Sequence, residues 1–223
     1  MSHNISTSTE NFIKAIYKYE QGVDLDTKPG SIAKELGITN AGATDMAQKL
    51  ARKKLINYEK YKELKLTPAG KKLALSVLRK HRLWETFLHQ VFELSMHEIH
   101  REAELLEHLT SDFLTDKIAL FLGNPLTDPH GDPIPTKQGI IPTNENNVIL
   151  SLAETGCEYE IARLSGSDKE YFDFCHSNQL KIGSKLCVNK QYKKNKMTEI
   201  EVGDTKLLLT MELANTIYIK KLK

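Results

Sequence analysis

Apolar residues change their spacing along this chain at a segment rich in proline and glycine, residues 123–143. Before that segment they recur every three or four positions, which is typical of amphipathic helices. After it they form short β-patterned runs that are separated by turn signals every eight to twelve residues. The chain is therefore expected to be α+β and mainly α, with a small antiparallel β-barrel or sandwich at its C-terminal end. The expected strands are Val148–Ala153, Tyr159–Leu164, Lys185–Val188, Thr198–Val202, Lys206–Leu209 and Ala214–Ile219.

Residues that favour helix ends indicate where the helices begin. Thr7 and Glu10 have the spacing of a capping box, and Thr67 before Pro68 supplies an N-cap and a proline for the first turn. Two short segments, 55–58 and 63–66, are expected to pair as strands. The expected helices are 9–21, 32–36, 40–55, 68–93, 96–109 and 112–122, with Ser31, Thr39 or Asn40, Ser95 and Ser111 as further N-caps.

The first third of the chain is basic. Residues 1–75 hold 13 Lys and Arg against 8 Asp and Glu, although the whole chain has a net charge of only +2. Helix, glycine-containing turn, helix and two-stranded wing, in that order, are typical of a winged helix-turn-helix that binds DNA. The alternative is a small helical domain with a solvated basic face. The expected DNA contacts are Thr39, Asn40, Thr44 and Asp45 near the start of the recognition helix, and Lys49, Arg52, Lys60 and Lys62 for the phosphates.

Histidines and acids gather in the middle third. Five of the eight histidines lie within one 28-residue stretch, and residues 76–143 hold 10 Asp and Glu against 6 Lys and Arg. Residues three or four positions apart share one face of a helix, so two facing helices could bring imidazoles and carboxylates onto one or two cations. The expected metal ligands are His81, Glu85, His100, Glu104, Glu107 and His108.

Nitrogen and oxygen donors without a thiolate suit Mn²⁺ or Fe²⁺, and Co²⁺, Ni²⁺, Zn²⁺ or Cd²⁺ could substitute for them. The alternative for each histidine is a surface residue or a satisfied core residue. His89, His97 and His130 are expected to be of that kind.

Several classes of protein do not fit this sequence. No run of eighteen apolar residues is present, so no membrane span is expected. The three cysteines lack C-x-x-C spacing, which suits a reducing cytoplasm rather than a disulfide scaffold. Neither a zinc-protease motif, nor a phosphate-binding loop, nor a nucleophile elbow appears. A non-enzymatic protein is therefore favoured.

The sequence resembles the diphtheria-toxin-repressor family of metal-dependent transcriptional regulators over nearly its whole length. The segments that carry the resemblance are Thr9–Ile13, Ile32–Leu50, Leu66–Gly70, Arg79–Glu85, Glu102–His108 and Asp128–Pro135. The resemblance implies a winged helix-turn-helix domain over 1–75, a helical metal-binding and dimerisation domain over 76–143, and an SH3-like (FeoA-like) domain over 144–223. It also implies a homodimer that represses metal-uptake genes by binding a palindromic operator when it is loaded with metal.

The resemblance further implies two metal sites. The first takes Glu104, Glu107 and His108 together with a first-helix residue, here Asn11, where family members carry Met or Asp. The second takes His81, Glu85 and His100, and the C-terminal domain can lend a ligand, for which Asp168 is the candidate. Glu at position 104, where iron-responsive members carry Cys, favours Mn²⁺.

Two other functions stay open at this point. The chain could be a winged-helix regulator that no metal switches, with an acidic middle that is purely structural. It could also be a metal-trafficking protein or a metallohydrolase. For the favoured function, a metal-dependent repressor, the expected partners are operator DNA and a second copy of the chain. Neither a membrane nor a small-molecule substrate is expected as a partner.

Overall fold

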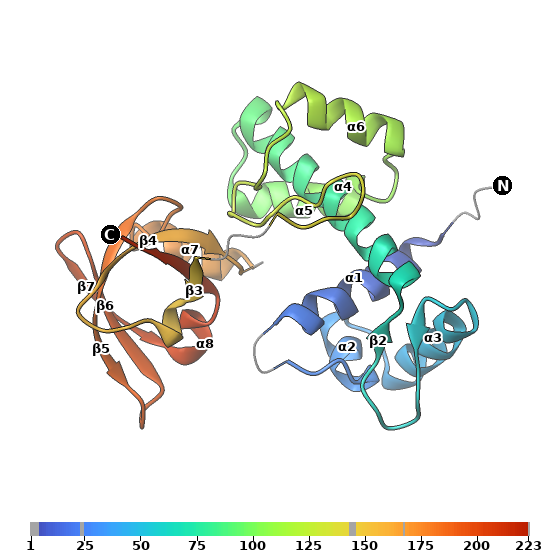
Figure 1. Ribbon diagram of the computed structural model, residues 1–223, viewed down its shortest axis with the longest axis horizontal. Helices are drawn as coiled ribbons and strands as arrows, with labels where there is room; N and C mark the ends of the chain where they lie inside the picture. The colour runs from blue at the N-terminus through green and yellow to red at the C-terminus, as the bar shows by residue number, and fades with distance from the viewer. Residues whose placement is uncertain (1–4, 23–24, 143–145, 167, 223) are drawn as a thin grey trace.

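The computed structural model describes residues 5–22, 25–142, 146–166 and 168–222 of the protein. Figure 1 shows three parts: an N-terminal group of short helices with a small sheet, a helical group crossed by one long helix, and a C-terminal sheet. Among the helices of the described residues, none combines the length and the apolar composition that crossing a lipid bilayer would require.

The N-terminal part contains three helices and a two-stranded sheet. Aliphatic and aromatic side chains such as Phe12, Ile16, Ile32 and Leu50 form its core. The predicted order of helix, turn, helix and wing is confirmed, but each strand of the wing has only two residues. The elements are α1 (Thr7–Gln21), α2 (Pro29–Glu35), α3 (Asn40–Arg52), β1 (Ile56–Asn57) and β2 (Lys65–Leu66), with β1 and β2 antiparallel.

Three predicted helix boundaries in this part are wrong. The first helix begins at Thr7 rather than residue 9, with Ser6 at the N-cap and no side-chain capping bond, so the capping box predicted from Thr7 and Glu10 does not form. The second helix begins at Pro29 rather than after Ser31, because proline fits a first turn and the Ser31 hydroxyl donates to Asp26 Oδ1 at 2.6 Å instead of capping. The third helix ends at Arg52 rather than near Leu55, because Lys54 adopts the left-handed region with φ of 57°.

The helical part consists of α4 (Pro68–Phe92), α5 (Met96–Leu106) and α6 (Asp112–Phe121). Predicted N-caps start all three: the hydroxyls of Thr67, Ser95 and Ser111 accept hydrogen bonds from Gly70, Glu98 and Leu114 N–H groups. Glu98 also completes a capping box with Ser95. The fifth helix ends at Leu106 rather than residue 109, which leaves Glu107 and His108 at its C-terminal end.

The proline-rich segment that comes after α6 in the sequence packs along α4. Arg79 and Arg82 on that helix donate hydrogen bonds to the carbonyls of Pro135 and Pro133, at 2.8 and 2.6 Å. Gly131 adopts φ of +83°, and a Cβ there would lie 2.1 Å from the carbonyl oxygen of Ala162 in β4. Glycine at this position therefore allows the segment to lie against the C-terminal sheet.

The C-terminal part is a six-stranded antiparallel sheet of order β3-β8-β4-β5-β6-β7. Its core includes Tyr159, Ile161, Val188, Ile200 and Ile219. The strands are β3 (Asn147–Ile149), β4 (Glu158–Leu164), β5 (Lys185–Tyr192), β6 (Met197–Val202), β7 (Thr205–Thr210) and β8 (Ile217–Lys221).

Helical turns in this part were not predicted. A full helix, α7 (Lys169–Ser177), buries Tyr171, Phe172 and Cys175, and its aromatic content hides the helical period. A one-turn helix, α8 (Met211–Ala214), replaces the start of the last expected strand. The first expected strand ends at Ile149, where a 3₁₀ turn over Leu150–Leu152 begins.

Candidate metal centre and nucleic-acid interface

Facing positions on α4 and α5 bring two imidazoles and a carboxylate together. Glu85 Oε1 lies 3.0 Å from His81 Nε2 and 3.0 Å from His100 Nδ1, and these two ring nitrogens are 3.3 Å apart. We call His81, Glu85 and His100 the imidazole cluster. His81 and Glu85 are almost fully buried, whereas His100 is partly exposed.

The charges of the imidazole cluster stabilise one another. Burial alone would raise the pKa of Glu85, but His81, His100 and His130 hold it well below its usual range. Burial alone would lower the pKa of His81, but the carboxylates of Glu85 and Glu107 outweigh burial and raise it to about 9. An acid this deeply buried and surrounded by imidazoles is typical of a functional site.

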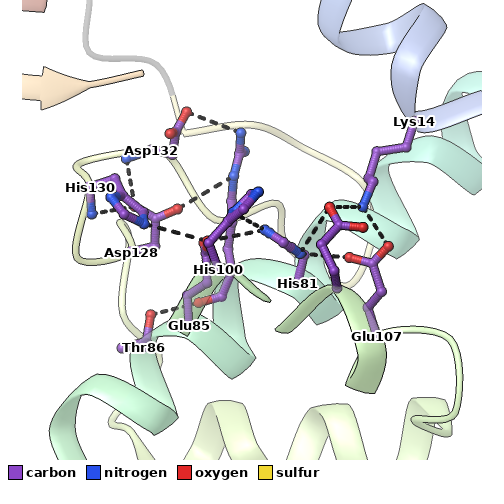
Figure 2. A network of polar contacts seen from close by, with 11 residues as sticks. Lys14, His81, Glu85, Thr86, His100, Glu107, Asp128, His130 and Asp132 are labelled. Carbon is purple, nitrogen blue, oxygen red and sulfur yellow. Dashed lines mark hydrogen bonds and ion pairs between the residues drawn. The ribbon is translucent and has the colours of Figure 1, made fainter. Parts of the chain in front are cut away.

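His130 joins this cluster from the proline-rich segment, as Figure 2 shows. Its Nε2 lies 3.5 Å from Glu85 Oε1. Nε2 of His130 is buried and has no hydrogen-bond partner. Asp128 accepts the backbone N–H of His130 at 2.9 Å, and the imidazole lies against the ring of Phe172 on α7. The sequence predicted no role as a ligand for His130, because the path of an irregular segment carries no periodic signal.

A second group forms where α5 ends beside α1. Donor atoms of Glu104, Glu107 and His108 lie within 4.8 Å of one another, and we call these three residues the carboxylate cluster. Glu107 is 1% exposed. His81 connects the two clusters, since its Nδ1 lies 2.7 Å from Glu107 Oε2 while its Nε2 faces Glu85.

The first helix supplies charges of both signs to the carboxylate cluster. Glu10 Oε2 lies 2.5 Å from His108 Nδ1, and Lys14 Nζ lies 2.7 Å from Glu104 Oε1. Burial alone would raise the pKa of Glu104, but Lys14 and His81 lower it to about 2. The DNA-binding part and the helical part are thus joined by ion pairs at the predicted metal ligands.

The arrangement of these donors fits a divalent cation. In each cluster a histidine has Nδ1 against a carboxylate, His81 on Glu107 and His108 on Glu10, so that Nε2 of each ring faces the other donors of its cluster: Glu85 for His81, and Glu107 for His108. Metal-binding histidines commonly have this arrangement. His108 Nε2 is buried without a hydrogen-bond partner, as is Oδ1 of Asn11, the residue after Glu10 on α1.

A cavity of about 520 Å³ opens beside the imidazole cluster. His81, Glu85, His100 and His130 lie on its wall, and Arg163 of the C-terminal sheet also contributes. The cavity gives a small ion access to the buried donors.

Asp168 lies outside both clusters. It is exposed, and its Oδ1 accepts the N–H of Tyr171 at 2.8 Å, which makes it the N-cap of α7. The three cysteines all lie in the C-terminal part, where Cys175 is buried in the core and burial raises its pKa to about 11. The clusters therefore contain only nitrogen and oxygen donors among the described residues.

The predicted DNA contacts lie on α3, the expected recognition helix, at its N-cap Thr39, and on the wing. Seven of the eight are exposed, and Thr44 is partly buried. Thr39 caps α3 by accepting the N–H of Gly42 at 3.1 Å, and Thr44 Oγ1 donates to the carbonyl of Asn40. Lys62 pairs with Glu59 on the surface of the wing.

Comparison with known protein families separates the same three parts. Residues 4–64 match the iron dependent repressor N-terminal DNA binding domain, and residues 67–136 match the iron dependent repressor metal binding and dimerisation domain. The chain belongs to the diphtheria-toxin-repressor family of metal-dependent regulators. Residues 148–221 match the FeoA domain. Members of this family are transcriptional repressors rather than enzymes.

Individual relatives agree with this membership. The iron-dependent repressor IdeR of Mycobacterium tuberculosis is 33% identical over 128 residues, which are 57% of this chain and 55% of that protein. The diphtheria toxin repressor of Corynebacterium diphtheriae is 30% identical over 128 residues, which are 57% of this chain and 56% of that repressor. The matching segment thus spans about half the length of these curated relatives.

Solved structures extend the likeness to nearly the whole chain. A manganese-dependent transcriptional repressor in complex with manganese matches with a TM-score of 0.88 at 29% identity. The match covers 96% of this chain and 100% of that chain. ScaR with bound Cd²⁺ matches with a TM-score of 0.85 at 28% identity, over 96% of this chain and 99% of the ScaR chain. The predicted fold is confirmed: a DNA-binding domain, a helical dimerisation domain and an SH3-like FeoA domain.

Proposed function

We propose that this protein is a metal-dependent transcriptional repressor that binds a palindromic operator as a homodimer when it is loaded with Mn²⁺ or Fe²⁺. The observation that carries the proposal is the position of the carboxylate cluster. It lies at the contact between α1, which belongs to the DNA-binding part, and the end of α5, which belongs to the helical part.

The proposed ligands are His81, Glu85 and His100 in one site, and Glu104, Glu107, His108 and Asn11 in the other. A bound divalent ion would supply a concentrated positive charge that these carboxylates and imidazoles share. Glu10 holds the imidazole of His108 through Nδ1, and Glu107 holds that of His81 in the same way. These contacts orient both rings before an ion arrives, which lowers the entropic cost of binding.

The DNA-binding part would act as one half of a pair. We place it at residues 1–75, the metal-binding and dimerisation domain at 76–143 and the FeoA domain at 144–223. In a dimer, contacts between α1 and α5 fix the direction of both recognition helices, so that they can enter major grooves separated by one helical turn or a multiple of it. Genes for metal uptake are the proposed targets, and a repressor of chromosomal genes works in the cytoplasm.

Mn²⁺ is the proposed ligand because the clusters offer oxygen and nitrogen without sulfur. Fe²⁺ is the second choice, and Co²⁺, Ni²⁺, Zn²⁺ or Cd²⁺ could occupy the same donors. Coupling between metal and operator binding has to be reciprocal, so operator DNA should tighten metal binding by the factor by which metal tightens operator binding.

The proposal is tested by operator binding with and without metal. Palindromic fragments are first selected from a random DNA library by the protein in Mn²⁺, and their affinity is then measured by fluorescence anisotropy in Mn²⁺ or in chelator. We expect tight binding in Mn²⁺ only. Equal affinity in chelator would favour the winged-helix regulator that no metal switches, and a selection without enrichment would contradict DNA binding itself.

A variant pair sharpens the DNA part of this test. Each lost phosphate contact lowers the slope of log affinity against log salt by about 0.9. We expect this change for Arg52→Ala on α3. The control is Lys194→Ala, an exposed lysine of the C-terminal part, which should keep the slope of the wild type. His108→Ala should abolish the response to metal and keep the fold, as circular dichroism would show.

A further inference from the structure

Lys14 is a buried lysine whose charge lies inside the carboxylate cluster. Its Nζ is 2.7 Å from Glu104 Oε1 and 2.5 Å from Glu107 Oε1, and its side chain is only 6% exposed. Figure 2 shows the side chain of Lys14 extending from α1 toward Glu107, next to His81. The pairs join positions 90 and 93 residues apart in the sequence.

The position of Lys14 on α1 explains why its ammonium group lies in the carboxylate cluster. Phe12, Ile13, Ile16 and Tyr17 hold the helix against the core, and Lys14, which is also buried, points away from that apolar face to Glu104 and Glu107. A lysine in this position loses most of its hydration, so it requires partners of opposite charge. Glu104 and Glu107 provide two.

A divalent ion in the carboxylate cluster would need the same oxygen atoms. Glu104 and Glu107 supply two of its three donors, and the third is Nε2 of His108, which lies 3.2 Å from Glu107 Oε1 and is buried without a hydrogen-bond partner. An ammonium group and a divalent ion at hydrogen-bond distance from shared oxygens would repel each other strongly in a buried site. The two cations therefore compete for one position.

We propose that Lys14 is an internal counter-cation that occupies the carboxylate cluster in the metal-free protein and has to leave before the cluster binds a divalent ion. This inference rests on the proposed function, whose metal site it concerns. Its consequence is a lower apparent affinity, because only molecules with Lys14 displaced can bind the ion.

Glu85, the carboxylate of the imidazole cluster, has no such competitor. Among the described residues, no lysine or arginine forms an ion pair with Glu85, whose partners are His81, His100 and His130. The two clusters should consequently load in order. The imidazole cluster fills first, and the carboxylate cluster, which joins the DNA-binding part to the helical part, fills only at a higher concentration of metal.

Lys14→Met tests the inference, because methionine keeps an unbranched side chain and removes the charge. The matched control is Lys18→Met, one turn further along α1, which removes an equal charge that also acts on Glu104 but forms no ion pair with it among the described contacts. Mn²⁺ binding to metal-free protein is measured by isothermal titration calorimetry, and the number of bound ions by equilibrium dialysis.

We expect Lys14→Met to tighten the weaker of two Mn²⁺ sites by roughly tenfold or more. The stronger site, and both sites of Lys18→Met, should change by less than about twofold. In chelator Lys14→Met should unfold at a lower temperature than the wild type, since two buried carboxylates lose their counter-charge, and Mn²⁺ should remove this difference. An unchanged or weaker second site would overturn the inference.

A measurement on the wild type covers the case in which the variant does not fold. An amine-reactive acylating reagent labels exposed lysines, and mass spectrometry gives the rate at each position. Saturating Mn²⁺ should increase the rate at Lys14 by roughly tenfold relative to exposed Lys28. An unchanged rate would overturn the inference, whereas the absence of any Mn²⁺ binding in the wild type would contradict the proposed function itself.

Discussion

Glu10 on α1 and His108 beyond the end of α5 form an ion pair across 98 residues of sequence, with Oε2 of the first 2.5 Å from Nδ1 of the second. The contact connects the DNA-binding part to the metal-binding part through Nδ1 of His108, the ring nitrogen that is not the proposed metal donor. A carboxylate in this position fixes the orientation of the ring and makes its other nitrogen a better donor.

Glu10→Gln should weaken Mn²⁺ binding at the carboxylate cluster by about tenfold, because an amide keeps the shape of the side chain but holds the imidazole less strongly. Calorimetry on the metal-free protein measures the effect. Glu63→Gln, an exposed change in the wing, is the control and should leave the affinity unchanged. Equal affinity of both variants would mean that the ion pair does not support the ligand.

His130 provides the second prediction. Its unpartnered Nε2 near Glu85 makes it a candidate fourth donor of the imidazole cluster. His130→Ala should weaken the stronger Mn²⁺ site by about tenfold or more and leave the carboxylate cluster nearly unchanged. The backbone carbonyl of His130, which accepts the N–H of Leu164, remains in the variant.

The control for this change is His176→Ala, an exposed histidine of α7. It removes the same type of side chain away from the cluster and should leave both Mn²⁺ affinities as they are. If His130→Ala also leaves the stronger site unchanged, then His130 only packs against Phe172, which agrees with the prediction from the sequence that it is not a ligand.

The sequence predicts those parts of the site that lie on regular helices. The spacing from His81 to Glu85 puts these two donors on one face of α4, and the N-caps fix where α4 and α5 start. The sequence also puts His100 to His108 on one helix face, whereas α5 ends at Leu106 and His108 lies beyond it. The sequence could not give contacts made by irregular chain, such as His130. Nor could it show that the ammonium group of Lys14, which stands where some manganese-responsive members of the family have an acid, is buried on the acids of α5, because that contact depends on how two domains pack.

Exposed apolar side chains on and near α6 carry the third prediction. Leu109, Phe113, Leu120 and Phe121 are each more than half exposed, and Figure 1 shows α6 at the outer edge of the helical group. An apolar surface of this kind is typical of an interface between proteins. It lies in the part of the chain that matches the dimerisation domain.

Phe113→Asp should therefore weaken the dimer by about 100-fold, because a charge would be buried in place of an aromatic ring. Sedimentation analysis over a range of protein concentrations measures this shift, and affinity for a palindromic operator should fall with it. Leu208→Asp on β7, where the replaced leucine is 52% exposed, is the matched control. A variant Phe113→Asp that remains fully dimeric would place the interface elsewhere.

Asp168 was expected to lend a ligand to the imidazole cluster, whereas the structure places its carboxylate on the N-terminus of α7. Loss of an N-cap costs about 1 kcal/mol. Asp168→Ala should accordingly lower the free energy of unfolding of the C-terminal domain by that amount, with both Mn²⁺ affinities unchanged. Asp168→Asn should restore most of the stability, because its side-chain oxygen can still accept the Tyr171 N–H. A loss of Mn²⁺ affinity in Asp168→Asn, with stability restored, would show instead that the carboxylate reaches the ion when metal binds.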